Sequence, residues 1–388
     1  MKRQIIKKIA TILLIWLFIG LSGFLFRHSP AFRAFYVTDF YPFFEKIRLY
    51  LLGWCPFSIG DILYCLAGIW LIAGIVELVR ALIFLRKYPH AWLRLLFRGI
   101  VVSSLCYAFF LWGWAYNYHY DRTGRVFAVQ PAPYKTAELK RFCCWLAGEV
   151  NKYHRALDTT GEDSIHHFLS ESGIIRRIPA YYSLLAAKYP SLHYVHASIK
   201  PSMFGSLMNY AGITGYFNPF TGEAQLNTTA PPVGLPFTTC HEVAHQLGFA
   251  AEDDANFVGY LVASSAPDPH FRYSAHFEIL PYALRALSYR DTTAADSIWQ
   301  QVLLPGVRKD YDVVEHFYQH FSGPVNGMLT VFYDHYLKAN DQELGIKSYS
   351  HVINLLLNYF HTMQFSGNSP LADRDERRKV KAIRATRK

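Results

Sequence analysis

Three long apolar segments constrain this chain of 388 residues more than any other feature of its sequence. They cover residues 9–26, 59–79 and 99–116, and each is long enough to cross the hydrocarbon core of a bilayer as one helix. The first and third contain no charged residue, and the second carries Asp61 and Glu77 only near its ends. We therefore expect three transmembrane helices, rather than three buried helices of a soluble protein.

The basic residues beside these segments predict their orientation. The N-terminus is basic, and fewer basic residues lie close to the segment ends in the first connection, where acidic residues accompany them. No clear cleavage site follows the first segment, which favours an anchor over a removed signal peptide. Because cytoplasmic loops carry an excess of Lys and Arg, the N-terminus and the second connection are expected in the cytoplasm of a bacterium. The second connection and its borders contain five basic residues: Arg80, Arg86, Lys87, Arg94 and Arg98.

This orientation divides the chain into a membrane region, residues 1–116, and a domain on the outer side of the cytoplasmic membrane. We expect that domain to span residues 117–365 and a basic, disordered tail to follow over residues 366–388. The net charge of +10 comes largely from basic residues that flank the apolar segments and close the chain. No nucleic-acid-binding motif occurs, so the lipid bilayer is the expected partner of these charges.

The pattern of the outer domain is mainly helical, with a small β component. Helical periodicity runs through residues 136–157 and through most of residues 271–361. Alternation at residues 193–200 favours a strand, and residues 214–217 and 223–228 flank a turn-rich connection that is typical of a hairpin. We therefore expect an α+β domain in which a small sheet or hairpin precedes a helix that carries the chemistry.

That helix contains the sequence His-Glu-Val-Ala-His, which places His241 and His245 four residues apart. On an α-helix this spacing puts both imidazoles on one face, where they can hold one tetrahedral zinc ion. Glu242 between them is typical of the general base in HExxH peptidases. We expect the helix to be capped by Thr238 rather than by a capping box of Thr239 with Glu242, because this leaves Glu242 free to face the metal.

A catalytic zinc site with two histidines needs a third ligand and an open position. Gly248 is placed to end the first helix, and three carboxylates then precede a second helix-like run. An acidic first turn is also favoured by the helix macrodipole, so its presence alone does not identify a ligand. From the pattern, any of three residues can be the third ligand: Glu252, Asp253 and Asp254.

Residues 198–202, 215–227, 235–245 and 252–260 resemble segments of an uncharacterised group of bacterial membrane proteins that carry a zincin motif. The group is a domain family of unknown function. The resemblance extends over most of the chain, including the apolar segments, and it does not by itself imply an activity.

A second resemblance concerns the residues after the motif. The sequence Glu-Asp-Asp-Ala-Asn from Glu252 to Asn256 is similar to the E-x-x-A-D motif of gluzincin membrane proteases of the prenyl-protein and heat-shock type. The resemblance implies that Glu252 is the third zinc ligand. It also implies that Asn256 takes the position of the aspartate that supports a ligating histidine, which its amide oxygen can do by accepting the imidazole N–H.

Together these features predict a membrane-anchored zinc peptidase with a zincin-like domain that acts on a peptide or protein substrate. Zinc would polarise the scissile carbonyl, and Glu242 would pass a proton from water to the leaving amine. One alternative is a catalytically silent sensor or scaffold with the same fold, and another is a zinc hydrolase that does not cleave peptides. The intact Glu242 argues against a silent protein, which has no need of that carboxylate.

Overall fold

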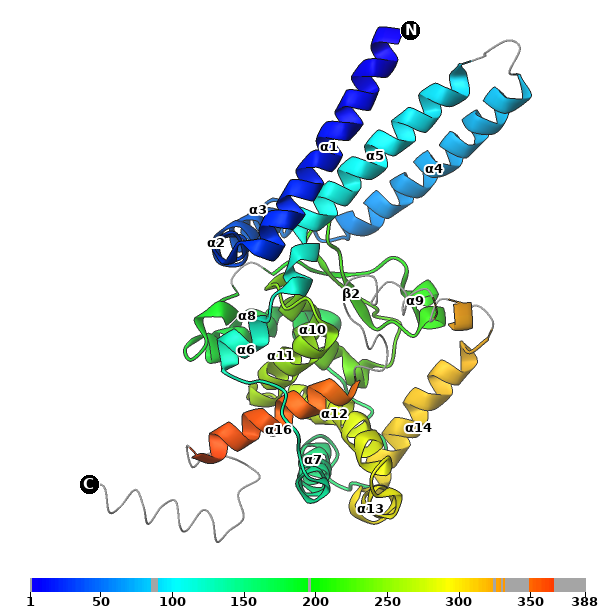
Figure 1. Ribbon diagram of the computed structural model, residues 1–388. Coiled ribbons are helices and arrows are strands. Elements are labelled where there is room, and N and C mark those ends of the chain that lie inside the picture. Colours follow the sequence, from blue (N-terminus) through cyan, green and yellow to red (C-terminus); the bar gives the residue numbers. More distant parts are fainter. Residues whose placement is uncertain are drawn as a thin grey trace. The chain divides into compact units, whose positions relative to one another are not determined.

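The computed structural model (Figure 1) describes the chain with the exception of residues 1, 85–89, 195–196, 324–325, 329–330, 332–348 and 366–388. The basic tail expected at residues 366–388 lies outside the described residues. The chain divides into two compact units. The first comprises Met1–Tyr120 with Asn218–Glu223, and the second comprises Asp121–Phe217 with Ala224–Lys388.

The first unit contains three helices that are long and apolar enough to cross a membrane (blue to cyan in Figure 1). They are α1 (Lys2–His28), α4 (Ile59–Ile83) and α5 (Ala91–Gly113). The expectation of three such helices is confirmed. The third begins at Ala91 rather than at residue 99, so that Arg94 and Arg98 lie inside the helix. A helix of this kind can include them because their long side chains can extend along an apolar surface toward the helix end.

The surfaces of these helices explain why water is a poor solvent for them. Many large apolar side chains are exposed, among them Leu17 at 66%, Ile72 at 64% and Ile83 at 69%. Soluble proteins rarely expose a continuous apolar surface of this kind, whereas lipid tails cover it at no cost. Three shorter helices connect α1 to α4: α2 (Pro30–Phe35), the π-helical η1 (Tyr36–Phe40) and α3 (Tyr41–Leu52).

The short segment Asn218–Glu223 belongs to the first unit although it connects two strands of the second. The carboxylate of Glu223 accepts hydrogen bonds from the backbone N–H groups of Ile59 (3.1 Å) and Gly60 (2.7 Å). These are donors at the start of α4 that lack a partner within the helix, and the helix macrodipole favours a negative charge there. Arg48 donates to the Pro219 carbonyl at 2.6 Å and fixes the same segment from α3.

The second unit is mainly helical. Its long amphipathic helix α7 (Thr136–Leu157) packs along α12 (Pro269–Ser288) and buries Leu139, Phe142 and Leu146 completely. This confirms the helix expected at residues 136–157. The other described α-helices are α6 (Arg122–Phe127), α8 (Glu171–Ala186), α9 (Gly205–Ala211), α10 (Leu235–Gln246), α11 (Glu252–Ser265), α13 (Thr292–Ser297), α14 (Pro305–His320) and α16 (Tyr349–Phe365).

A three-stranded sheet precedes α10. Its strands are β1 (Ile199–Pro201), β2 (Gly215–Phe217) and β3 (Ala224–Leu226), in the order β1-β3-β2. β2 pairs antiparallel with β3, with Tyr216 opposite Gln225, which confirms the expected hairpin. β1 runs parallel to β3 and is shorter than the strand expected at residues 193–200. Because β2 lies at the edge of the sheet and contacts α10, it adjoins the helix with the two histidines.

Candidate metal centre

The start of α10 differs from the sequence-based expectation of a cap at Thr238. The helix begins at Leu235, after Gly234, and Pro236 occupies its first turn. Proline is well suited to that position, because its missing N–H would have no partner there and its φ angle is already helical. Thr238 therefore lies inside the helix and donates to the Thr214 hydroxyl at 3.3 Å. Glu242 lies beyond the first turn of the helix and takes no part in a capping box. Its side chain is therefore still free to face the metal.

The end of α10 returns the chain toward the two histidines. Gly248 has a φ of +87°, a conformation that favours glycine, and its N–H donates to the His245 carbonyl at 2.8 Å. The N–H of Phe249 donates to the Ala244 carbonyl at 3.1 Å, which completes a glycine C-cap of the Schellman type. α11 then begins at Glu252, so the helix break predicted at Gly248 is confirmed.

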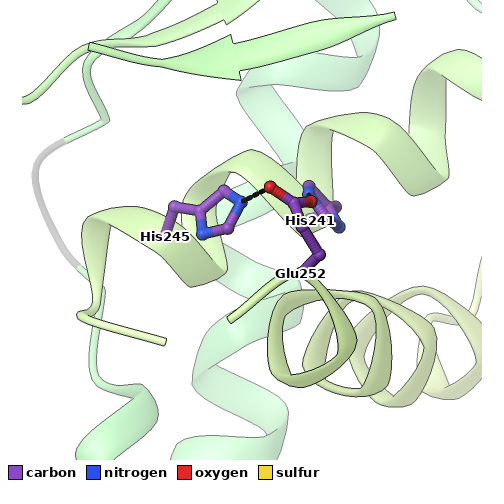
Figure 2. Close-up of side chains that lie close together, drawn as sticks. All are labelled: His241, His245 and Glu252. Atoms are coloured by element: carbon purple, nitrogen blue, oxygen red, sulfur yellow. Dashed lines mark ion pairs between the residues drawn. The ribbon is translucent and has the colours of Figure 1, made fainter. Parts of the chain in front are cut away.

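This turn brings together three side chains that can hold a metal ion (Figure 2). The ligand atoms of His241, His245 and Glu252 lie within 4.8 Å of one another. Glu252 Oε2 lies 3.3 Å from His241 Nε2, and Glu252 Oε1 lies 3.8 Å from His245 Nε2. Among the histidine, cysteine and carboxylate side chains that the structure describes, these three are the ones that lie close enough together to share a metal ion.

The distances from the Glu252 carboxylate to the two histidines are close to those between the ligand atoms of a zinc ion. Ligand atoms about 2.0–2.2 Å from a tetrahedral zinc ion are about 3.3–3.6 Å from one another. The 3.3 Å between Glu252 and His241 falls in that range, and the 3.8 Å to His245 is slightly longer. Two imidazoles and one carboxylate are also the donor set of many catalytic zinc sites.

The orientation of His245 is set by the backbone. Its Nδ1 lies 2.8 Å from the Phe249 carbonyl oxygen, which can only accept, so Nδ1 carries the proton and Nε2 is directed to Glu252. An outer hydrogen bond of this kind is usual for a histidine that binds metal. Nδ1 of His241 is buried and has no hydrogen-bond partner among the described residues. Asn256 is 8% exposed and forms no side-chain hydrogen bond with a described residue, so its supporting role stays a prediction.

Glu242 lies beside the three ligands but is not one of them. Its side chain is buried, with an exposed fraction of 3%, and Oε2 has no hydrogen-bond partner in the described part of the chain. Burial raises the pKa of Glu242 from its ordinary 4.5 to about 7; the two histidines oppose this rise and the charge of Glu252 adds to it. A carboxyl group with a pKa near neutrality can both take up and release a proton at physiological pH.

The charges of the ligands depend on one another. Burial alone would lower the pKa of His245, but the Glu252 and Glu242 carboxylates and the Phe249 carbonyl together raise it to about 9. The pKa of Glu252 is held well below 4.5, because hydrogen bonds from His241 and His245 outweigh the effect of burial. Without a metal, Glu252 is therefore ionised beside a protonated His245, and a bound cation would take the place of the His245 proton.

The two other candidate ligands lie apart from the histidines. Asp253 is buried, and its Oδ2 lies 3.3 Å from Nδ1 of His351 on α16. Asp254 is outside the ligand group, and burial raises its pKa to about 7. Among the three carboxylates that the sequence left open, the geometry thus favours Glu252. Cys240, next to His241, is fully buried and lies outside the ligand group.

Sequence reasoning missed two glycines that shape the centre. A Cβ at Gly259 would lie 3.0 Å from the backbone nitrogen of His241, so α11 approaches α10 closely at this point. A Cβ at Gly215 on β2 would lie 2.8 Å from Glu242 Oε1. Gly259 stands seven residues after Glu252, two helical turns further along the same face, and this spacing was the signal that could have revealed a close helix contact.

Comparison with known proteins places the chain in a family. The family described as "Protein of unknown function (DUF3810)" matches residues 36–357, which is most of the chain. The chain belongs to the DUF3810 family. The match includes α4, α5, the sheet and the three candidate ligands. Searches of curated proteins and of solved structures gave no match.

Proposed function

We propose that this DUF3810 protein is a membrane-anchored, zinc-dependent peptidase with a zincin-like catalytic domain. The observation that carries the proposal is the meeting of His241, His245 and Glu252 within 4.8 Å, with Glu242 buried beside them. A helix with two histidines four residues apart, followed by a carboxylate from the next helix, is the ligand arrangement of many zinc peptidases.

In this proposal His241, His245 and Glu252 would hold the zinc ion. When bound, zinc would supply Lewis acidity toward a carbonyl oxygen and would lower the pKa of water. Phe249 supports the site by fixing the ring of His245, since its carbonyl occupies Nδ1 and leaves Nε2 for the metal. Two ligands come from α10 and one from α11, so the close packing of these helices at Gly259 positions all three.

Glu242 would serve as the general base and then as the general acid. It would take a proton from the attacking water and deliver it to the leaving amine. Its burial and its pKa near 7 support this role, because the group can exist in both protonation states near neutral pH. Since Oε2 has no partner within the described chain, the carboxyl group can receive a hydrogen bond from a water molecule or a substrate.

We further propose that the protein is a multi-pass protein of the bacterial cytoplasmic membrane with its catalytic domain on the outer side. Support comes from the three apolar helices and from the basic residues around the connection between α4 and α5. A reporter that is active only outside the cytoplasm should work when fused after Tyr120 and fail when fused after Phe84. The opposite pattern would place the metal centre in the cytoplasm.

The activity is tested with Glu242→Gln in the full chain, using an unfolded protein such as casein as the probe. We expect the wild type with zinc to cleave casein, and we expect the variant to bind zinc but to cleave it at least about 100-fold more slowly, in line with the loss of a general base. A silent scaffold would show zinc binding without cleavage in either form. A zinc hydrolase that does not act on peptides would also leave casein intact, but it would cleave a small ester in a Glu242-dependent manner.

A further inference from the structure

A large cavity lies in the first unit, between α1, α4 and α5. Its volume is about 1030 Å³, enough for a small organic molecule or part of a lipid. α1 and α4 each pack on α5, and the cavity occupies the space that this arrangement leaves between them. It belongs to a different unit from the metal centre, so the proposed peptidase chemistry does not account for it.

The walls of the cavity carry an excess of positive charge. Four cationic side chains line it, from all three helices, against one carboxylate, Glu77: the cations are Lys8, Arg80, Arg94 and Arg98. Within the described residues, none of the four forms an ion pair with a carboxylate. Four cations around a single carboxylate repel one another, and a bound anion would relieve that repulsion.

Three of the four cations lie near helix ends, and the fourth, Arg98, lies one turn further into α5 than Arg94. Lys8 lies near the start of α1, Arg80 in the last turn of α4, and Arg94 in the first turn of α5, all of which are helix ends. Val101 and Val102, which also line the cavity, lie about 10 Å further along α5. Along α5 the cations alternate with the apolar Leu95 and Phe97, and the lining beyond Arg98 is apolar.

We propose that this cavity binds an anionic phospholipid, with the phosphate of its headgroup among the four cations and an acyl chain along the apolar wall of α5. Basic pockets between transmembrane helices on the cytoplasmic side are a recurring way to bind such headgroups. A free phosphate ion would satisfy the cations but would leave the wall of Leu95, Phe97 and Val101 uncovered. The proposal rests on the proposed membrane insertion and is independent of zinc and of catalysis.

The test compares two lipids that differ only in headgroup charge. The full chain is purified in a mild detergent, and binding of phosphatidylglycerol and of phosphatidylcholine with identical acyl chains is measured by native mass spectrometry. We expect one phosphatidylglycerol molecule to be retained in preference to phosphatidylcholine. Equal retention of the two lipids would overturn the proposal, and this result needs no variant.

A pair of variants locates the site. Replacing Arg94 and Arg98 together by Gln should weaken phosphatidylglycerol binding by about 25-fold, which corresponds to about fivefold for each basic residue near the membrane surface. The double change to Lys keeps both charges and should retain the lipid. In the matched control, Gln replaces the exposed Arg27 and Lys46, which are in the same unit but do not line the cavity. This variant should bind phosphatidylglycerol as the wild type does. Equal loss in the control would overturn the proposed location.

Two further outcomes test whether the ligand is a free anion and whether the chain is inserted in a membrane. If inorganic phosphate alone displaces the bound lipid, the cavity takes a free anion and the lipid proposal is wrong. If the full chain is soluble without detergent, membrane insertion itself is wrong, whereas a detergent-dependent chain with no lipid preference contradicts only the proposed cavity ligand.

Discussion

Gly215 on β2 lies so close to Glu242 on α10 that a Cβ at Gly215 would stand 2.8 Å from Glu242 Oε1. The same Cβ would stand 2.8 Å from Thr238 Cγ2, one turn earlier on α10. The edge strand therefore packs its backbone directly against the proposed general base, and the ring of Phe217 on the same strand lies 6.4 Å from that of His245. The sheet fixes the position of Glu242 as well as closing one side of the centre.

This contact predicts that Gly215→Ala impairs activity without removing the metal. The new methyl group has no free space, so either β2 or the Glu242 side chain must shift, and a catalytic group displaced by about 1 Å can cost about 100-fold in rate. We expect zinc content to match the wild type while casein cleavage falls by about 10- to 100-fold. Cleavage at the wild-type rate would show that β2 does not position Glu242.

A second prediction concerns Gly259, where α11 approaches α10. A Cβ at this position would lie 3.0 Å from the backbone nitrogen of His241 and 3.1 Å from its Cα, and backbone atoms cannot move aside as a side chain can. We expect Gly259→Ala to destabilise the fold by about 1–3 kcal/mol and to weaken zinc binding, because it separates Glu252 from the histidines. Thermal unfolding and zinc titration of the full chain in detergent measure both effects.

The matched control for this substitution is Gly148→Ala on α7. A Cβ at Gly148 would meet no atom within 4 Å, so alanine should be neutral or should stabilise the helix by up to about 1 kcal/mol. If Gly259→Ala behaves like the control, the two helices are not in close contact and the arrangement of the three ligands is wrong.

The third prediction assigns the carboxylate ligand. Glu252→Ala should lower zinc affinity by more than the about 10- to 100-fold that outer-shell changes cost, because it removes an anionic ligand. Asp253→Ala and Asp254→Ala should keep their zinc, since Asp253 pairs with His351 and Asp254 lies outside the ligand group. Zinc loss in an aspartate variant together with full retention in Glu252→Ala would move the third ligand.

The sequence predicted much of this centre because its signals are local. The spacing of His241 and His245, the break at Gly248 and the acidic start of the next helix all follow from rules that act over a few residues. The α10 cap was misplaced, because Pro236 and a threonine pair both mark helix starts and the pattern alone does not rank them. The choice of Glu252 depends on how α11 folds back on α10, which is a tertiary contact.

The role of Glu223 shows where local rules end. The sequence places this residue at the start of a strand, where a charged side chain has no evident function. The structure shows its carboxylate at the N–H groups of Ile59 and Gly60, which are more than 160 positions earlier in the chain. A partnership over such a separation leaves no periodicity or spacing that a single sequence can reveal.

A fourth prediction concerns pH and the buried His276 on α12. Burial, with a smaller effect of the Lys152 and Arg272 charges, lowers its pKa from 6.5 to about 3; its Nδ1 lies 3.1 Å from the Tyr260 hydroxyl. Between pH 6.5 and about 3, His276 is protonated in the unfolded chain but neutral in the folded chain. The free energy of unfolding should therefore fall as the pH is lowered through this window.

The His276→Gln variant isolates this contribution, because glutamine can still accept a hydrogen bond from Tyr260. Unfolding of both proteins is followed in detergent from pH 7 downward. The wild type should lose up to about 1.4 kcal/mol per pH unit more than the variant within the window. Identical pH dependence in the two proteins would show that His276 becomes protonated without unfolding.

Zinc binding by His241, His245 and Glu252 is measured directly as the metal content of the purified full chain. The protein is prepared without chelators, zinc is measured per chain, and X-ray absorption at the zinc edge identifies the ligand atoms. We predict close to one zinc per chain, bound by two imidazoles and a carboxylate oxygen, and loss of that zinc in His241→Ala and in His245→Ala. A folded wild-type protein that contains no zinc and takes up none when zinc is added would contradict the account.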